Sequence, residues 1–421
     1  MDVSQGLVFD FPTVTATEGN VKILVPKLET LAKKELEYAR SKAPVFYNPA
    51  MEFNRDLAIS AIQIYQRMVK RDIDACEPLA GCGVRGIRIA REVDGIGKVI
   101  INDISPEAAK LAEYNVKMNK LGEKVTVANE DANLLLSQYA MPRRRFDYID
   151  IDPFGSPVLY LDSALRALRN GALLALTATD LAPLCGVHPK ACLRKYGGKP
   201  LRTEYCHELA TRLVIGCLAT VAAKHDIAVN PLLSYRRYNH VRTYVRVSYS
   251  AKEADRSIEK MGYVLHCFSC FHREEQMGTA ASLRQNCPHC GSKLQAAGPL
   301  WLGPLWDAEF CVRIRDEIGK RKLKSRFMIG QMMSLIIGEA KAPITYYVVD
   351  KICDKFNLPI PPLARVMEEL RKLEFQAVAT HFSSKAFRTD ASSAVVKETI
   401  GKLARISSAQ SQETFLGRLS M

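Results

Sequence analysis

The sequence predicts a doubly wound α/β domain, because strand-like and helix-like segments alternate along residues 72–177. Strands that alternate with helices pair in parallel within one sheet, and helices then cover both of its faces. The last predicted strand is almost wholly apolar, as is typical of a strand buried on both sides. The predicted strands are residues 72–77, 98–101, 124–128, 146–151 and 171–177.

A glycine-rich turn follows the first predicted strand and opens a helix over residues 87–92. Gly81, Gly83 and Gly86 match the pattern Gly-x-Gly-x-x-Gly, which lets a ligand approach backbone N–H groups at a helix N-terminus. The second strand ends at Asp103, where a ribose diol needs an acceptor, although an aspartate that only caps a turn is the alternative. The pattern predicts a nucleotide-type cofactor site.

The loop after the third predicted strand carries polar side chains at the same edge of the sheet. It contains Asp131, Ala132 and Asn133. A carboxylate and an amide at this place could hold an adenine edge, or they could only cap the short helix predicted over residues 134–139.

The fourth predicted strand ends in Asp152-Pro153-Phe154-Gly155. Pro153 and Gly155 stop regular structure, so the sheet edge presents the Asp152 carboxylate and the Phe154 ring together. These groups suit chemistry on a flat, amine-bearing substrate. The alternative is an ordinary Asp-Pro turn with a core phenylalanine.

An aromatic turn lies ahead of the first strand, at residues 44–49. Its Phe46 and Tyr47, together with the following Arg55, are candidate ligand contacts. The alternative is a packed turn and a helix-capping segment before a helix predicted over residues 57–70.

Composition favours a polyanionic partner. The 421 residues carry a formal net charge of +14 with a pI near 9.2, and neutralised phosphates release counterions. No apolar run reaches the roughly 18 to 20 residues of a spanning helix, and no secretory pattern is present, so we expect a cytoplasmic protein without a membrane partner. The twelve cysteines fit reduced thiols and a metal.

Two other pairs of reactive residues are weaker signals. Cys185 and His188 lack a third group to orient the imidazole, so a nucleophile site is not favoured there. His207 and Glu208 lack the second histidine of a zinc protease helix.

A strand pair is predicted over residues 227–233 and 241–250, with aromatic and cationic side chains at its turn. Such groups suit base stacking and phosphate pairing, although a solvated hairpin tip is an equal alternative. The turn residues are Tyr235, Arg236, Arg237, Tyr238, His240 and Arg242.

Two Cys-x-x-Cys pairs give the clearest metal signal. Their separation matches a tetrahedral structural zinc site in a zinc ribbon, with a loop expected over residues 273–285. Neighbouring histidines leave mixed ligation as an alternative. The cysteines are Cys267, Cys270, Cys287 and Cys290, and the histidines are His266, His272 and His289.

The chain beyond residue 301 predicts a mainly helical domain. The basic segment 313–326 suits a phosphate-facing helix, although a solvated surface helix is the usual explanation. Helices over 343–356 and 363–373, followed by short strands, predict a winged-helix-like fold, which binds nucleic acid or protein. From Ser392 we expect a loosely ordered tail.

These motifs together resemble the tRNA (guanine-26, N2)-dimethyltransferases, particularly their shorter archaeal-type members. The resemblance spans nearly the whole chain. The matching segments are Phe46-Tyr47-Asn48-Pro49, Asn54-Arg55-Asp56, the turn from Leu79 to Gly86, Asn102-Asp103, Glu130-Asp131-Ala132, the loop from Asp150 to Pro157, Leu184-Cys185-Gly186 and Lys195-Tyr196-Gly197.

The resemblance implies a Rossmann-like class I methyltransferase domain that moves methyl groups from S-adenosylmethionine to N2 of guanine 26 in tRNA. The products would be N2-methyl- and then N2,N2-dimethylguanosine. It places Asp152, Pro153, Phe154 and Phe46 at the target base, and a C-terminal domain on the tRNA. The residues expected at S-adenosylmethionine are Arg55, Gly81, Gly83, Arg85, Asp103, Asp131 and Ala132.

Guanine N2 is a poor nucleophile because its lone pair is delocalised into the ring. Asp152 and the Pro153 carbonyl would accept its N–H groups and hold the nitrogen in line with the methyl group. Phe154 and Phe46 would sandwich the base after it flips out of the tRNA stack.

The predicted organisation has five parts and no obligate protein partner. The parts are an N-terminal extension (1–50), the methyltransferase domain (51–255), a zinc ribbon with Zn²⁺ (256–300), a tRNA-binding domain (301–390) and a tail (391–421). Within the extension, residues 3–17 resemble a strand or hairpin and residues 27–41 a charged helix.

Two other functions share parts of this pattern. An NAD-dependent dehydrogenase would use the glycine turn and Asp103, but it leaves the Asp-Pro-Phe-Gly loop and the basic segments without a role. A DNA-binding regulator with a zinc ribbon and a winged helix would leave the cofactor turn idle.

Overall fold

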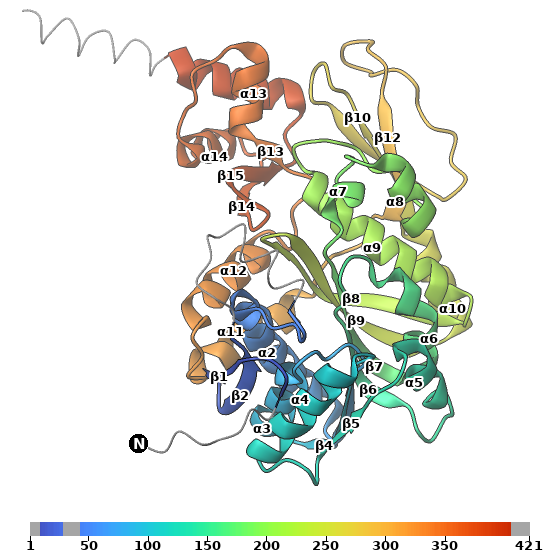
Figure 1. Cartoon of the computed structure of the whole chain (residues 1–421). Helices are drawn as coiled ribbons and strands as arrows, with labels where there is room; N and C mark the ends of the chain where they lie inside the picture. The colour runs from blue at the N-terminus through green and yellow to red at the C-terminus, as the bar shows by residue number, and fades with distance from the viewer. Residues whose placement is uncertain (1–8, 28–42, 406–421) are drawn as a thin grey trace, which may run out of the picture.

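The computed structural model describes residues 9–27 and 43–405 (Figure 1). The helix expected over residues 27–41 therefore lies almost wholly outside the described residues. The strand or hairpin expected over residues 3–17 lies partly outside the described residues. Within them a hairpin is present further along the chain, formed by β1 (Thr13–Glu18) and β2 (Val21–Pro26), which pair antiparallel.

A mixed seven-stranded sheet forms the centre of the molecule and confirms the α/β class. Its order is β5-β4-β3-β6-β7-β9-β8, and every neighbouring pair from β5 to β7 is parallel. The last two strands join antiparallel. The strands are β3 (Ile73–Glu77), β4 (Ile96–Asn102), β5 (Val125–Ala128), β6 (Phe146–Ile151), β7 (Leu168–Ala178), β8 (Ile227–Arg237) and β9 (His240–Tyr249).

The strand order places a topological switch point between β3 and β6. The chain runs outward from β3 to β4 and β5, and then returns to add β6 on the other side of β3. The loops after β3 and β6 consequently leave the same sheet edge in opposite directions, which is where doubly wound sheets bind ligands.

Helices cover the two faces of the sheet as separate layers (Figure 1). One layer contains α2 (Glu52–Val69), α3 (Val84–Glu92), α4 (Pro106–Met118) and α11 (Ala308–Lys320). The other contains α5 (Ala132–Gln138), α6 (Leu161–Ala167), α9 (Cys206–Ala223) and α10 (Ala251–Glu259).

The helix α2 begins earlier than the sequence pattern predicts. Its buried stretch runs from Phe53 to Tyr65 and includes Asn54, Arg55 and Asp56, which do not fit an apolar periodicity. These polar side chains are tolerated because charged partners from other elements meet them in the interior.

The fifth predicted strand begins earlier than expected. A 3₁₀ turn, η2 (Pro157–Tyr160), and α6 follow the Asp152 loop, and β7 already begins at Leu168 instead of residue 171. Arg169 then lies on β7 and pairs with the buried Asp147 of β6. Because Asp147 neutralises the Arg169 charge, β7 can include a charged residue at its beginning.

The region in which the sequence predicts a zinc ribbon is a three-stranded antiparallel sheet in the order β11-β10-β12. Its strands are β10 (Met261–His266), β11 (Arg273–Met277) and β12 (Gln295–Trp301). The sequence pattern predicts a loop over residues 273–285, but the polar segment Arg273–Met277 is an edge strand. Pairing with β10 decides this, since the segment has no apolar alternation.

The C-terminal region contains α12 (Arg326–Gly338), α13 (Val349–Phe356) and α14 (Leu363–Lys372). A small sheet of β13 (Tyr347–Val348), β15 (Ser383–Thr389) and β14 (Ala377–Thr380) lies beside them. The basic segment expected as one helix is divided, because α11 ends at Lys320 and α12 starts at Arg326.

The expectation of a loosely ordered tail after Ser392 is wrong for residues 393–405, which are helical. Val396, Ile400 and Leu403 pack with Val349 and Ile352 of α13 in one apolar cluster. The polar composition of this segment reflects only its outer face.

The helix α9 is long and apolar enough to cross a membrane by length and composition alone. Its side chains are largely buried, however, and it packs between β8 and the ribbon strand β12. Burial in the protein interior explains its hydropathy.

Candidate active site and metal centre

The glycine turn connects β3 to α3 and requires glycine at two positions. Gly81 and Gly83 have φ angles of +55° and +77°, which side-chain-bearing residues rarely adopt. A Cβ atom on Gly83 would lie 2.8 Å from Ile101 Cδ1, and one on Gly81 would lie 3.0 Å from the Phe46 carbonyl oxygen. The Phe46 turn therefore lies directly against the glycine turn.

Asp103 follows β4 and is fixed by backbone donors. Its Oδ2 accepts the Gly81 N–H at 2.8 Å, and its Oδ1 accepts the Ser105 N–H at 3.0 Å. A carboxylate has about four acceptor positions, so capping the turn still leaves positions for a ligand's hydroxyl groups.

Asn102, directly before Asp103, joins the loops of three strands. Its amide nitrogen donates to the carbonyl groups of Pro78 and Glu130 at 3.0 and 2.9 Å. Its oxygen accepts the Glu130 N–H at 2.9 Å. The sequence pattern includes this residue without showing that it fixes the edge of the cofactor site.

Asp131 caps the helix α5. Its Oδ1 accepts the N–H groups of Asn133 and Leu134 at 2.9 and 3.1 Å, while Ala132 is buried beside it. The capping interpretation is thus observed. It occupies one carboxylate oxygen and leaves the exposed side chain at the same sheet edge as Asp103.

Asp152 stands at the end of β6 and pairs with Arg85 of α3 through its Oδ2. The Arg85 guanidinium is buried and also lies 3.2 Å from Glu77, 3.2 Å from Asp150 and 3.3 Å from Asn54 Oδ1. Arg85 therefore fixes the orientation of the Asp152 carboxylate. Burial raises the pKa of Glu77 to about 8, although the Arg85 charge opposes this rise.

A second buried ion pair, between Arg242 and Asp150, lies close to Asp152. Arg242 of β9 donates to both oxygens of Asp150 at 2.9 and 2.6 Å and to Thr177 Oγ1 at 2.7 Å. Burial alone would raise the pKa of Asp150, but Arg242 and Arg85 outweigh burial and lower it. Asp150 stays ionised, and its contacts join the three strands β6, β7 and β9 next to the Asp152 loop.

The loop that carries Asp152 is anchored to the loop after β7. Gly155 N–H donates to Thr179 Oγ1 at 2.7 Å, and Thr179 N–H donates to the Gly155 carbonyl at 2.9 Å. The next residue, Asp180, accepts from Tyr196 at 2.5 Å and from Lys195 at 3.0 Å. The basic helix α8 (Pro189–Tyr196) is thereby fixed next to this loop.

Phe154 and Phe46 are brought together, as the resemblance implies, but they contact each other. Their ring centroids are 4.7 Å apart with an interplanar angle of 83°. A base between two rings needs about 7 Å, which is twice the contact spacing of carbon atoms. The sandwich is therefore not preformed, and one ring must move to admit a base. Phe154, which is 70% exposed, has room to do so.

Arg55 forms an ion pair with Glu18 of β1. Its Nε and Nη2 donate to the two Glu18 oxygens at 2.5 and 2.7 Å, and Nη2 also donates to the Asn48 carbonyl at 3.1 Å. Tyr47 OH donates to Glu18 at 3.2 Å. Arg55 thus fixes the Phe46-Tyr47 turn, and nothing in the sequence pattern pointed to Glu18.

Burial divides the aromatic and cationic residues of the β8–β9 hairpin into two groups. Tyr235, His240 and Arg242 are buried in strands, whereas Tyr238 at the turn is 56% exposed. Burial lowers the pKa of His240 to about 4, so this imidazole is neutral near pH 7. The tip, with the exposed Tyr238 and the half-buried Arg236 and Arg237, is the accessible part of this set.

Of the buried polar atoms that have no hydrogen-bond partner in the described part of the chain, three lie near Asp152 and Arg85: Asn54 Nδ2, Tyr235 Oη and His240 Nε2. Tyr235 and His240 both lie close enough to Asp152 for its charge to act on them, and Asn54 contacts Arg85. The sequence patterns include all three residues but do not predict that they lie beside Asp152 and Arg85.

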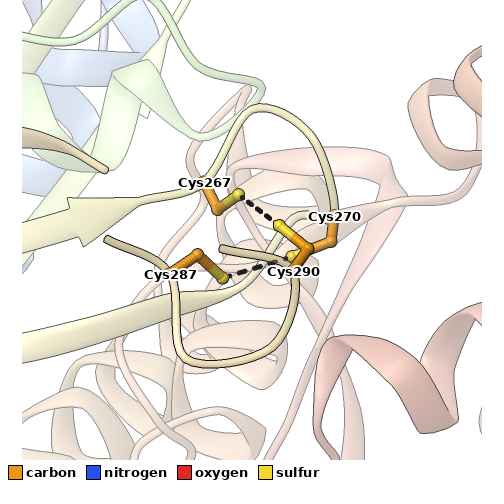
Figure 2. A group of neighbouring side chains, drawn as sticks. All are labelled: Cys267, Cys270, Cys287 and Cys290. Atoms are coloured by element: carbon orange, nitrogen blue, oxygen red, sulfur yellow. Dashed lines mark hydrogen bonds between the residues drawn. The ribbon is translucent and has the colours of Figure 1, made fainter. Parts of the chain in front are cut away.

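The four ribbon cysteines meet as predicted (Figure 2). Cys267 Sγ lies 3.4 Å from Cys290 Sγ, and Cys270 Sγ lies 3.6 Å from Cys287 Sγ. All four sulfur atoms lie within 4.8 Å of one another, as four tetrahedral thiolate ligands require. His266 bonds instead to Tyr205 OH at 3.0 Å. The group that could hold a metal is therefore composed of four thiols.

The chain is similar to known proteins over nearly its whole length. A family model described as "N2,N2-dimethylguanosine tRNA methyltransferase" matches residues 19–401. A tRNA (guanine(26)-N(2))-dimethyltransferase of Methanothermobacter thermautotrophicus is 38% identical over 390 residues, which cover 93% of this chain and 99% of that protein. A tRNA (guanine(26)-N(2)/guanine(27)-N(2))-dimethyltransferase of Aquifex aeolicus is 35% identical over 378 residues, 89% of this chain and 92% of that protein.

A solved structure extends this likeness to the fold. The complex of Trm1 from Pyrococcus horikoshii with S-adenosyl-L-methionine superposes with a TM-score of 0.80 at 32% sequence identity. The superposition covers 92% of this chain and 100% of that chain.

Proposed function

The chain belongs to the N2,N2-dimethylguanosine tRNA methyltransferase family, and we propose that it methylates N2 of guanine 26 in tRNA. The donor is S-adenosylmethionine, and the products are N2-methyl- and then N2,N2-dimethylguanosine. Membership of the family confirms the resemblance drawn from the sequence motifs. The observation that carries the proposal is the Asp152 carboxylate, held by Arg85 beside the glycine turn at the switch point of the sheet.

The residues at the glycine turn fit S-adenosylmethionine. Gly81 and Gly83 keep the turn free of Cβ atoms, and Asp103 has acceptor positions left for a ribose diol. When bound, the cofactor supplies the electrophilic methyl group. Arg85 follows Gly83 by two residues, and Arg55 donates to the Asn48 carbonyl of the Phe46 turn. Both orient carboxylates, Asp152 and Glu18. The residues proposed to form the cofactor site are Arg55, Gly81, Gly83, Arg85, Asp103, Asp131 and Ala132.

Asp152 holds and deprotonates the target amine in this proposal. Arg85 occupies its Oδ2, so Oδ1 accepts an N2–H bond, and the Pro153 carbonyl accepts the other. These contacts localise electron density on N2 and align it for attack. After N2 takes the methyl group, it carries an extra proton, which Asp152 accepts.

Phe154 and Phe46 hold the flipped base. The exposed Phe154 ring moves away from Phe46 and stacks on guanine, which offsets an unstacking cost of a few kcal/mol. The net charge of +14 attracts the tRNA backbone to the protein.

The ribbon and the C-terminal region complete the proposal. Four thiolates from the ribbon hold a structural Zn²⁺. The succession β13, α13, α14, β14 and β15 is winged-helix-like and provides a tRNA-binding domain over residues 301–390. Free thiols and a tRNA substrate suit the cytoplasm.

Nucleoside mass spectrometry tests the function. The full chain is incubated with S-adenosylmethionine and a tRNA transcript, and N2-methylguanosine is expected to appear first, followed by N2,N2-dimethylguanosine. A transcript with adenine at position 26 is the control. Unmodified tRNA would refute the proposal, and methylation that persists in the control would show that another guanine, such as guanine 27, is a substrate.

A further inference from the structure

A second cluster of metal-type ligands lies outside both the ribbon and the methylation site. Cys185 directly follows the short helix α7 (Leu181–Leu184), and Cys206 and His207 are the first residues of α9. The two sulfur atoms and one imidazole nitrogen lie within 4.8 Å of one another, and all three side chains are half-buried. Twenty residues of chain separate Cys185 from the other two, so only the fold brings them together.

We propose that Cys185, Cys206 and His207 bind a second zinc ion. Two thiolates and one imidazole form a ligand set that zinc prefers. With Zn–S near 2.3 Å and Zn–N near 2.0 Å, ligand atoms around a tetrahedral zinc ion lie roughly 3.5 Å apart. The cluster thus needs rotamer adjustments of about an ångström, not a rearrangement of the backbone.

The ligand set balances the charge of the ion. A metal binds cysteine as the thiolate, so zinc binding releases the protons of Cys185 and Cys206. Two thiolates neutralise Zn²⁺, so the filled site carries no net charge.

The fourth ligand position is open to water. The two carboxylates nearest along the chain already pair with arginines: Glu208 with Arg212 at 2.8 Å and Arg388 at 2.9 Å, and Glu204 with Arg273 at 3.2 Å. The histidine of the Cys-x-x-His sequence, His188, is exposed and is not a member of the cluster. Three protein ligands with one open position define an exchangeable site, in contrast to the closed four-thiol site of the ribbon.

The ion would connect the Asp152 loop to the helix α9. Cys185 lies five residues after Asp180, and the neighbouring Thr179 holds Gly155 of the Asp152 loop. Zinc at this place would fix that loop to the N-terminus of α9.

Metal counting on the full chain tests the inference independently of methylation. The protein is incubated with excess Zn²⁺, freed of unbound metal by gel filtration and measured by inductively coupled plasma mass spectrometry. Two zinc ions per chain are expected. Cys185→Ser and His207→Gln should each bind one, and Cys290→Ser should also lose one, from the ribbon.

Cys217→Ser is the matched control, because Cys217 lies on α9 outside both clusters. It should bind two zinc ions. His207→Gln provides the result if Cys185→Ser fails to fold. One zinc ion in the wild type, unchanged in His207→Gln, would overturn the inference, as would a Cys185–Cys206 disulfide in the zinc-treated protein.

Discussion

At the scale of single residues, Asp152 and Arg85 determine what the site can do. Arg85 is buried and meets carboxylates from β3 and β6, so it holds Asp152 in one orientation at the end of its strand. An oriented carboxylate can accept a proton from an amine without first paying the cost of ordering its own side chain. The motif Asp-Pro-Phe-Gly supplies the carboxylate, and the contact with Arg85 of α3 holds it in the orientation that proton transfer requires.

Asp152→Asn should lower kcat for tRNA methylation by about 10²- to 10⁴-fold, because the amide can neither accept the N2 proton nor pair with Arg85 as an anion. The affinity for S-adenosylmethionine, measured by calorimetry, should change little. Asp162→Asn is the control, since Asp162 is an exposed residue of α6. Wild-type kcat in Asp152→Asn would exclude a proton-accepting role.

Phe154→Ala should raise KM for tRNA by roughly 5- to 150-fold, the equivalent of about 1–3 kcal/mol of base stacking. Leu159→Ala is the matched control, because Leu159 is similarly exposed, at 77%, in the following turn. Steady-state kinetics with varied tRNA separate the two variants. Equal KM values would show that Phe154 does not stack on the substrate.

At the scale of elements, the turn from β3 to α3 is the most constrained part of the site. Gly83 directly precedes α3 in a left-handed conformation, and Gly86 packs so closely that a Cβ would lie 2.1 Å from Ile101 Cγ2. The glycines therefore serve two purposes, access for a ligand and contact between α3 and β4. The spacing of these glycines can be recognised in the sequence, because the turn and the helix are formed by residues that are neighbours in the chain.

Gly83→Ala should destabilise the protein by about 1–3 kcal/mol, because it adds both an unfavourable φ and a contact at 2.8 Å with Ile101. Thermal unfolding measures the loss. Gly122→Ala is the control, since a Cβ there meets nothing within 4 Å, and its effect should stay within about 0.5 kcal/mol. Equal melting temperatures would contradict the strained turn.

At the scale of the whole molecule, one arginine joins the C-terminal region to the catalytic half. Arg388 of β15 pairs with Glu339 after α12 at 2.5 Å and with Glu208 of α9 at 2.9 Å. All three side chains are buried. The small C-terminal sheet is thus attached to α9 through charge pairs as well as apolar contacts. Its position relative to the Asp152 loop depends on these contacts.

This network predicts an acid-sensitive contribution to stability. Burial alone would raise the pKa of Glu339, but His381 and Arg388 outweigh burial and lower it to about 2 from 4.5. Because the folded pKa is below the unfolded one, the stabilisation is present above pH 4.5 and is lost as the pH falls towards 2. It amounts to about 3 kcal/mol.

Glu339→Gln should therefore be about 3 kcal/mol less stable than the wild type at pH 7, and this difference should shrink between pH 4.5 and pH 2. Urea unfolding at a series of pH values measures it. Glu113→Gln, on the exposed face of α4, should match the wild type throughout. A difference that does not change with pH would exclude Glu339 as the titrating group.

The sequence by itself determined the parts of the site that depend on neighbouring residues. The glycine turn, Asp103, the Asp152 loop and the four ribbon cysteines are each set by turn chemistry or ligand spacing within a few residues, and together they identified the family. The last strand of the parallel set, β7, was equally legible, because burial on both faces leaves an almost continuous apolar segment.

Only the tertiary structure decided how these parts act on one another. The pairs Arg85–Asp152, Arg55–Glu18 and Arg388–Glu208 join residues far apart in the chain, and the charges that burial permits cannot be read from apolar periodicity. The contact between Phe46 and Phe154 and the meeting of Cys185 with Cys206 likewise depend on how separate loops pack. Local sequence specifies which groups a loop presents, and long-range packing specifies which of them meet.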